Sequence, residues 1–217
     1  MKILAKQKLL MIGDSITDVG RARPVGEGLF EALGKGYVAF VQGLLDTCYP
    51  ERQIRVVNMG TSGNTVKDLR VRWHDDVLQQ RPDWLSIMIG INDVWRQFDS
   101  PKQSERHVLI DEYETTLDEL CAETKPQLQG LVLMTPFFIE ALKNDAMRVR
   151  MDQYGASVKK LAKKHKAVFV DTQAAFAPVL KHMHSAALAW DRVHPSFSGH
   201  FVLAKAFLDG VGFEWQR

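Results

Sequence analysis

A serine, a histidine and an aspartate in this chain have the types and positions that acyl transfer requires. Ser15 directly follows a short apolar run that Gly13 closes. His194 lies in a loop beside a proline, and Asp191 precedes it by three residues, a spacing that in a tight turn lets a carboxylate reach one ring nitrogen. We therefore predict that Ser15 is a nucleophile, His194 its general base and Asp191 the acid that orients the base.

Each of these residues also has a purely structural interpretation. A serine or aspartate after a strand is most often a helix cap, and Asp191 with His194 more often forms a surface turn. Asp171, at the end of a predicted strand, is a rival acid that could equally cap the next helix, and we rank it below Asp191. The other histidines lie in or beside charged, helix-like stretches or open the last helix: His74, His107, His165, His182, His184 and His200.

Acyl transfer also needs hydrogen-bond donors that face the developing oxyanion. Ser15 offers its own backbone N–H, Gly63 offers another at close approach because it lacks a Cβ, and Asn92 offers a side-chain amide. For Gly63 or Asn92 alone, ordinary turn chemistry is the favoured interpretation. Three suitable residues at three strand ends together favour an oxyanion hole.

The elements that must position these residues alternate between strand and helix. Apolar runs predict strands at 9–12, 54–57, 84–89, 131–134 and Val168–Val170. Apolar periodicity and terminating prolines predict helices at Tyr37–Cys48, 66–80, 109–123, 147–165, 173–181 and 199–208, and the glycine-rich stretch 21–36 reads as an ordered loop. This alternation predicts an α/β fold with a five-stranded parallel sheet covered on both faces.

A flavodoxin-like strand order, 2-1-3-4-5, would gather the candidate residues. In that order the first strand lies between the second and the third, and the loops that leave their carboxyl ends meet at the topological switch point. Ser15, the loop 60–65 and the loop 90–93 would then surround one crevice.

Composition and charge narrow the class of protein. The 217 residues fit one domain spanning 1–217, with 46 % hydrophobic and 25 % charged residues, as in ordinary globular proteins. A net charge of +2 gives no case for a nucleic acid or an anionic membrane as partner, and the substrate could be neutral.

The N-terminal sequence and the short apolar runs predict a cytoplasmic protein. Polar residues 6–8 interrupt the apolar core of any signal peptide, and no apolar run approaches the length of a membrane span. Cys48 and Cys121 lack the spacing of a metal site or a disulfide framework. His182 and His184 would face the same way only on a strand, so we expect no metal there either.

Four short blocks, in this order, resemble the SGNH (GDSL-type) hydrolases: GDS at 13–15, SGN at 62–64, GIND at 90–93 and DRVH at 191–194. The first block continues with isoleucine where the family commonly has leucine, at a position that should be core packing. The resemblance implies a three-layer α/β/α fold of flavodoxin-like order and no cofactor. It also implies these roles: Ser15 as nucleophile, His194 as base, Asp191 as its acid, and Ser15, Gly63 and Asn92 as the oxyanion hole.

Longer strings resemble one bacterial branch of that family, the acetyl-xylan esterases, which act on acetylated xylo-oligosaccharides. These strings are GDSITDVGRARP, SIMIGINDVWRQFD, LMTPFFIE and ALAWDRVHPSFSGH. The resemblance implies removal of acetyl groups from small carbohydrates through an acetyl-serine intermediate, in a cytoplasmic homo-oligomer. The absence of a recognisable signal peptide fits imported oligosaccharides rather than cell-wall xylan.

Trp95, Arg96 and Trp190 flank the blocks and could form a platform and a polar wall for a sugar ring. Aromatic residues also dominate cores and interfaces, so packing or a subunit contact is the favoured interpretation, and Trp190 in particular could serve an oligomer contact. Three other functions stay open. A lysophospholipase or thioesterase of the same superfamily would need an apolar groove, a non-catalytic protein could bind carbohydrate, and a nucleotide binder is disfavoured because no phosphate loop follows the first strand.

Overall fold

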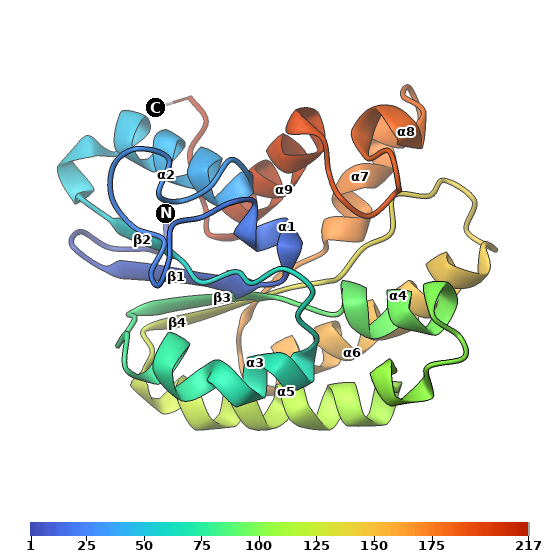
Figure 1. Ribbon diagram of the computed structural model, residues 1–217. Helices are drawn as coiled ribbons and strands as arrows, with labels where there is room; N and C mark the ends of the chain where they lie inside the picture. The colour runs from blue at the N-terminus through green and yellow to red at the C-terminus, as the bar shows by residue number, and fades with distance from the viewer. Residues whose placement is uncertain (217) are drawn as a thin grey trace.

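The strands form one parallel sheet in the order β2-β1-β3-β4-β5 (Figure 1). The computed structural model describes residues 1–216. The strands are β1 (Lys8–Gly13), β2 (Arg55–Asn58), β3 (Trp84–Met88), β4 (Gly130–Met134) and β5 (Val168–Val170). All four pairings are parallel, and every residue of β3 is buried because helices cover both faces of the sheet. The predicted flavodoxin-like order is confirmed.

Helices pack on both faces of this sheet. They are α1 (Ser15–Asp18), α2 (Tyr37–Cys48), α3 (Val66–Trp73), α4 (Ile91–Asp99), α5 (Ile110–Thr124), α6 (Ala146–Lys164), α7 (Thr172–Leu180), α8 (Ser185–Leu188) and α9 (Phe197–Gly210). Short 3-10 turns occupy Pro50–Arg52, Ser104–Arg106 and Lys125–Gln127. Helices α2 and α9 contact each other on one face, and α3, α5 and α6 form the other layer (Figure 1). The three-layer α/β/α architecture is therefore confirmed.

Helix α4 begins where the sequence predicted a loop. Gly90 leaves β3 with φ +127° and the helix starts at Ile91, so Asn92 and Asp93 lie in its buried first turn. The buried first turn combines the apolar Ile91 and Val94 with these two polar residues. The predicted helix 66–80 is α-helical only to Trp73 and continues as a π-helical turn, His74–Leu78. Within residues 1–216, no helix has both the length and the apolar character needed to cross a bilayer.

Close pairing at the carboxyl ends brings the loops of the three central strands together. Gly13 pairs with Met88 of β3, and its carbonyl oxygen accepts a hydrogen bond of 3.0 Å from the N–H of Thr61, in the loop after β2. A Cβ on Gly13 would lie 2.3 Å from the carbonyl oxygen of Met88. The residue two positions before Ser15 therefore has to be glycine.

We predict that Gly13→Ala lowers the free energy of unfolding by about 1–3 kcal/mol, the usual cost of overpacking. Gly43→Ala is the matched control, because a Cβ at Gly43 in α2 meets nothing within 4 Å. Alanine should raise stability there by about 0.5–1 kcal/mol through helix propensity. Urea unfolding measures both, and equal stability of the two variants would contradict the close-contact explanation.

Candidate active site

Ser15 and His194 meet although 179 positions separate them. Ser15 is the first residue of α1, and the Asp14 side chain caps this helix by accepting a hydrogen bond from the N–H of Ile16. His194 lies in the loop just before α9. The distance from Ser15 Oγ to His194 Nε2 is 2.9 Å, within hydrogen-bonding reach of a base and its nucleophile.

Asp191 holds the other side of the imidazole ring. Its Oδ2 lies 2.6 Å from His194 Nδ1, while its Oδ1 accepts hydrogen bonds from the backbone N–H groups of Val193 and His194 at 2.9 and 2.7 Å. Burial alone would raise the pKa of Asp191, but these hydrogen bonds and the nearby ring lower it below its usual value. The carboxylate therefore favours a proton on Nδ1 and leaves Nε2 free to accept the serine proton.

The rival acid, Asp171, has the structural role that was its alternative interpretation. Its Oδ1 caps α7 by accepting a hydrogen bond of 2.8 Å from the N–H of Ala174. His200 is also structural, since its Nδ1 accepts a hydrogen bond from the N–H of Tyr37, and burial lowers the pKa of its ring to about 4. The buried His200 imidazole is therefore neutral at pH 7 and holds the start of α2.

The residues predicted to form an oxyanion hole are Ser15, Gly63 and Asn92, and two of them are linked through one loop. The Nδ2 of Asn92 donates to the carbonyl oxygen of Asn64 at 2.9 Å, so the amide faces the loop that carries Gly63. Gly63 has φ +83°, a conformation that few side chains tolerate. In the described part of the chain, the backbone N–H groups of Ser15 and Gly63 donate to no acceptor. These two N–H groups are free to bind an oxyanion.

Arg96, a predicted substrate-binding residue, contacts Asn92 and lines a hollow beside Gly63. Its Nη2 donates to Asn92 Oδ1 at 3.2 Å, which orients the Asn92 amide, and its Nη1 pairs with Asp99. Its guanidinium lies 4.5 Å from the centroid of the Trp95 ring, and that ring meets the His194 ring edge-on with centroids 5.7 Å apart. Trp190 is 89 % exposed.

Comparison with known proteins places this arrangement in a family. Residues 11–201 match the GDSL-like Lipase/Acylhydrolase family. The chain belongs to this family. It is 64 % identical to an acetylxylan esterase of Geobacillus stearothermophilus over 217 residues, which cover 100 % of this chain and 99 % of the relative.

Two solved structures show how closely the fold of this GDSL-like hydrolase follows its relatives. One is a catalytic mutant, S15A, of Axe2, an acetylxylan esterase from Geobacillus stearothermophilus, with 63 % identity, a TM-score of 0.99 and coverage of 100 % of this chain and 99 % of that one. The other is LAE5, an α/β hydrolase enzyme from the metagenome of Lake Arreo, Spain, with 54 % identity, a TM-score of 0.96 and coverage of 98 % of both chains.

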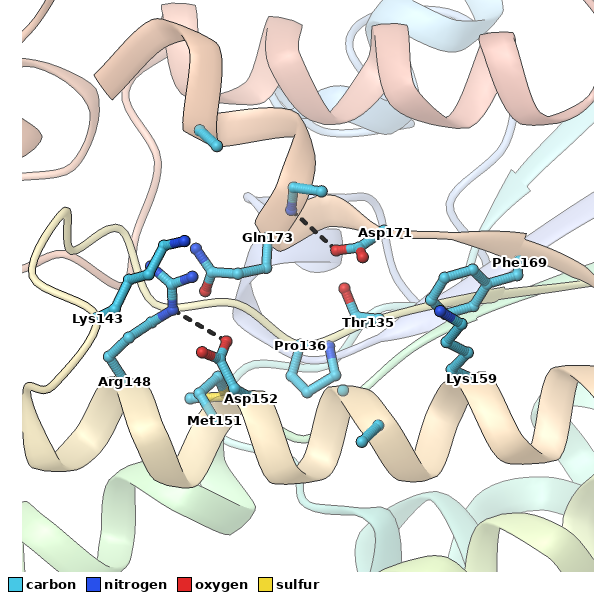
Figure 2. A pocket seen from close by; sticks show the side chains of 14 residues that line it. Thr135, Pro136, Lys143, Arg148, Met151, Asp152, Lys159, Phe169, Asp171 and Gln173 are labelled. Carbon is cyan, nitrogen blue, oxygen red and sulfur yellow. Dashed lines mark hydrogen bonds and ion pairs between the residues drawn. The ribbon is translucent and has the colours of Figure 1, made fainter. Parts of the chain in front are cut away.

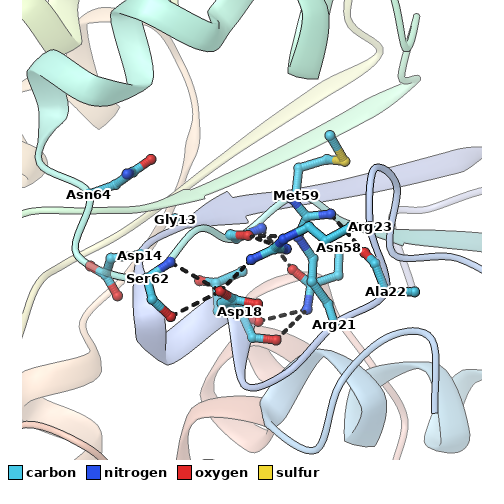
Figure 3. A network of polar contacts seen from close by, with 12 residues as sticks. Gly13, Asp14, Asp18, Arg21, Ala22, Arg23, Asn58, Met59, Ser62 and Asn64 are labelled. Atoms are coloured by element: carbon cyan, nitrogen blue, oxygen red, sulfur yellow. Dashed lines mark hydrogen bonds and ion pairs between the residues drawn. The ribbon is translucent and has the colours of Figure 1, made fainter.

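The buried carboxylate of Asp18, whose role the sequence did not reveal, connects two segments of this GDSL-like site, α1 and the loop that carries Gly63 (Figure 3). Asp18 belongs to α1, the helix that Ser15 begins. Its Oδ2 accepts hydrogen bonds from the Ser62 N–H at 3.0 Å, from Ser62 Oγ at 2.9 Å and from Arg23 Nη2 at 2.6 Å. Burial would raise the pKa of Asp18, but these donors lower it. Because Ser62 precedes Gly63, Asp18 connects the helix that begins at Ser15 to the loop that carries Gly63.

Arg72 also supports this loop, and the sequence did not reveal this role. It donates to the carbonyl oxygen of Gly13 at 2.9 Å, to that of Met59 at 2.7 Å and to Asn64 Oδ1 at 2.6 Å. These acceptors lie at the ends of β1 and β2 and in the loop between Gly63 and α3. Neither residue type nor local spacing could have identified Arg72 or Asp18, because their partners are distant in sequence.

Two further carboxyl groups of the family blocks, Asp14 and Asp93, are buried beneath the site. Burial raises the pKa of Asp14 to about 7 and that of Asp93 to about 8, and the negative charges of Asp14 and Asp68 raise the pKa of Asp93 further. Asp93 Oδ1 accepts a hydrogen bond of 3.0 Å from the Val66 N–H, whereas its Oδ2 has no partner within residues 1–216. At neutral pH the Asp93 carboxyl is mostly protonated.

We predict that Asp18→Asn lowers kcat by about tenfold with little change in KM, because a shifted oxyanion loop weakens transition-state binding more than substrate binding. Asp46→Asn, an exposed carboxylate in α2, is the matched control and should behave like wild type. Kinetics normalised by titration of active sites make the comparison. If the two variants have equal kcat per active site, the positioning role of Asp18 is wrong.

We predict that Asp93→Asn makes stability less dependent on pH. The folded state holds a proton on Asp93 up to about pH 8, whereas the unfolded chain loses it near the usual value of 3.8. Folded protein thus binds more protons in this window, and the free energy of unfolding falls as pH rises through it. Relative to wild type, the variant should gain at least about 1 kcal/mol between pH 4 and 8. Urea unfolding at pH 4 and pH 8 measures the free energy of unfolding of both proteins. If the difference between variant and wild type is the same at the two pH values, the prediction is wrong.

Proposed function

We propose that this chain is a serine esterase that removes acetyl groups from acetylated carbohydrates, with xylo-oligosaccharides as the substrate class. The hydrogen-bonded series of Ser15, His194 and Asp191 beside two free backbone N–H groups carries the proposal. The 64 % identity to an acetylxylan esterase over the full chain supports the substrate class. Relatives described as catalytic mutants carry S15A, H194A and D191A, and the same residue types stand at these numbers here.

The reaction has two steps in this proposal. Ser15 Oγ attacks the acetyl carbonyl carbon while His194 Nε2 accepts the hydroxyl proton, and the same ring then gives this proton to the departing sugar oxygen. Water next attacks the acetyl-serine, loses a proton to Nε2 and releases acetate as the serine is reprotonated. Asp191 stabilises the protonated ring in both steps, and no cofactor takes part.

The oxyanion of both tetrahedral intermediates is bound by three donors in this proposal: the N–H groups of Ser15 and Gly63 and the side-chain amide of Asn92. The amide is oriented by Arg96, whose contact with Asn92 Oδ1 leaves Nδ2 as the end directed toward the loop of Gly63. We therefore assign Arg96 a positioning role rather than the substrate contact that its sequence position suggested.

A carbohydrate substrate fits the surroundings of the site better than an acyl chain. The His194 side chain is 46 % exposed, so the reacting groups are open to a hydrophilic molecule. A hollow of about 260 Å³ beside Gly63 is lined mainly by polar and charged residues such as Thr65, Asp68 and Arg106. Trp95 and the exposed Trp190 can offer aromatic faces to a sugar ring. The lysophospholipase or thioesterase alternative needs an apolar groove, which this hollow does not provide.

Acetate release from acetylated xylose, acetylated xylo-oligosaccharides and acetylated glucose tests this function, with nitrophenyl acetate and octanoate as simple esters. We expect the xylo-oligosaccharides to be hydrolysed with the highest kcat/KM, nitrophenyl acetate faster than octanoate, and Ser15→Ala to be inactive. Equal or faster hydrolysis of octanoate would favour the lipid-active alternative. A wild-type protein that binds xylo-oligosaccharide without reacting with an organophosphonate would favour a non-catalytic binding protein.

We predict that Asn92→Ala lowers kcat by about 10²–10³-fold with little change in KM, because its amide acts on charge that develops only in the transition state. Arg96→Ala should lower kcat by a smaller factor, since the amide remains but is less well oriented. Steady-state kinetics on nitrophenyl acetate measure both variants. A rise in KM without loss of kcat in Arg96→Ala would restore its assignment as a substrate contact.

We also propose that the chain acts as one domain and associates with copies of itself. An apolar cluster of Phe197, Phe201 and Trp215 is exposed at α9 and the segment after it, with side chains from 42 to 69 % exposed. Trp190 adds a further exposed aromatic surface beside the site. Light scattering of the purified protein tests the assembly, and a monomer at micromolar concentration would overturn this part. The cytoplasmic location stays a prediction for cell fractionation.

A further inference from the structure

A hollow of about 410 Å³ opens between α6 and α7, and none of the proposed catalytic or oxyanion residues lines it (Figure 2). It lies where β4 and β5 end, since Thr135 follows β4 and Asp171 follows β5. A neighbouring hollow of about 260 Å³ shares Lys143, Arg148 and Gln173 with it. Its size is within the range of pockets that hold small molecules.

Gln173 directs an unpaired donor into this hollow. The side chain is only 8 % exposed, and its Oε1 accepts a hydrogen bond of 2.8 Å from the Phe138 N–H. That contact determines which end of the amide is nitrogen. Nε2 is buried and has no hydrogen-bond partner among residues 1–216. A buried donor without a partner destabilises the protein, so an acceptor from outside would be favoured here.

Two cationic groups converge on the same end of the hollow. Figure 2 shows Lys143 and the guanidinium of Arg148 directed toward the amide of Gln173. Arg148 is held in place, because its Nε donates to Asp152 Oδ1 at 2.9 Å and its Nη1 donates to the Glu140 carbonyl oxygen at 2.7 Å. Lys143 pairs with no acceptor in the described part of the chain.

The acidic groups that line the hollow are already engaged. Asp152 accepts from Arg148, and Asp171 caps α7 at the N–H of Ala174. Lys143 Nζ and the Nη2 group of Arg148 are therefore the cationic donors available to an anion. Away from them the wall is largely apolar, with Pro136, Met151, Phe169, Ala174 and Ala177.

We propose that this hollow is a binding site for a small organic carboxylate carried on an apolar, ring-sized body. The carboxylate would accept hydrogen bonds from Gln173 Nε2 and from the side chains of Lys143 and Arg148, and charge-assisted hydrogen bonds of this kind are strong. The ring would cover the apolar wall beyond them. The site is separate from the esterase site, although Phe138 and Glu140 belong to a segment that also contacts Arg192.

Calorimetric titration with benzoate tests the proposal directly. We expect benzoate to bind the wild-type protein with a Kd of about millimolar, and to bind Ser15→Ala equally well, because the hollow is not the esterase site. Acetate, which lacks a ring, and glucuronate, whose ring is polar, should each bind at least fivefold more weakly. Benzoate that fails to bind wild type overturns the site, and tighter binding of acetate or glucuronate overturns the apolar, ring-sized body.

Two variants and a control assign the donors. Lys143→Ala should weaken benzoate binding at least fivefold, whereas Lys102→Ala, which removes an exposed lysine from another turn, should not change it. Gln173→Glu keeps the acceptor for the Phe138 N–H but places a fixed carboxylate beside Lys143 and Arg148. It should abolish binding while leaving the melting temperature equal or higher. Unchanged benzoate affinity in both Lys143→Ala and Gln173→Glu would overturn the proposal, because binding would then lie elsewhere.

Discussion

The close approach of three strand ends at the centre of the sheet governs the geometry of the active site. β1 lies between β2 and β3, and Gly13 pairs with Met88 so tightly that no side chain fits between them. The loop after β2 continues this pairing through the hydrogen bond from Thr61 to Gly13. Because the strands are parallel, all three loops leave at the same edge, which is where ligands bind in open α/β sheets.

Below this edge, buried polar groups hold the loops in fixed positions. Asp18 and Arg72 use charge-assisted hydrogen bonds to join α1, the ends of β1 and β2, and the loop that carries Gly63. Such contacts are strong where water is excluded, and they order a loop that is too rich in glycine to order itself. Ser15 and His194 are partly exposed, so substrate can reach them. Their precise positions come from the more buried polar groups below.

The carboxyl ends of β4 and β5 lie at the same edge of the sheet, but the residues around them differ in chemistry from those around Ser15. Around Ser15 the donors are backbone N–H groups next to a nucleophile, which suits charge that appears during a reaction. Around Gln173 the donors are a lysine, an arginine and an amide with no nucleophile beside them, which suits a charge that is already present. One parallel sheet thus positions two chemically distinct sites at its carboxyl edge.

Much of the fold and of the candidate triad followed from the sequence alone. Short apolar strands and periodic helices are local signals, so the five strands and the helix Tyr37–Cys48 were predictable from hydrophobic pattern. Ser15, His194 and Asp191 were recognisable because their blocks stand at strand ends and in one tight turn, and the structure brings the three together.

Tertiary structure alone decided which polar residues support the site. Asp18, Arg72 and Gln173 occur in stretches where helix caps and surface charges are common, and each depends on partners that are distant in sequence. The contact of Arg96 with Asn92 also appears only in the structure, where α4 places the two residues one helical turn apart. Hydrophobic periodicity is local and survives in the sequence, whereas a hydrogen bond between distant segments exists only after the sheet has brought them together.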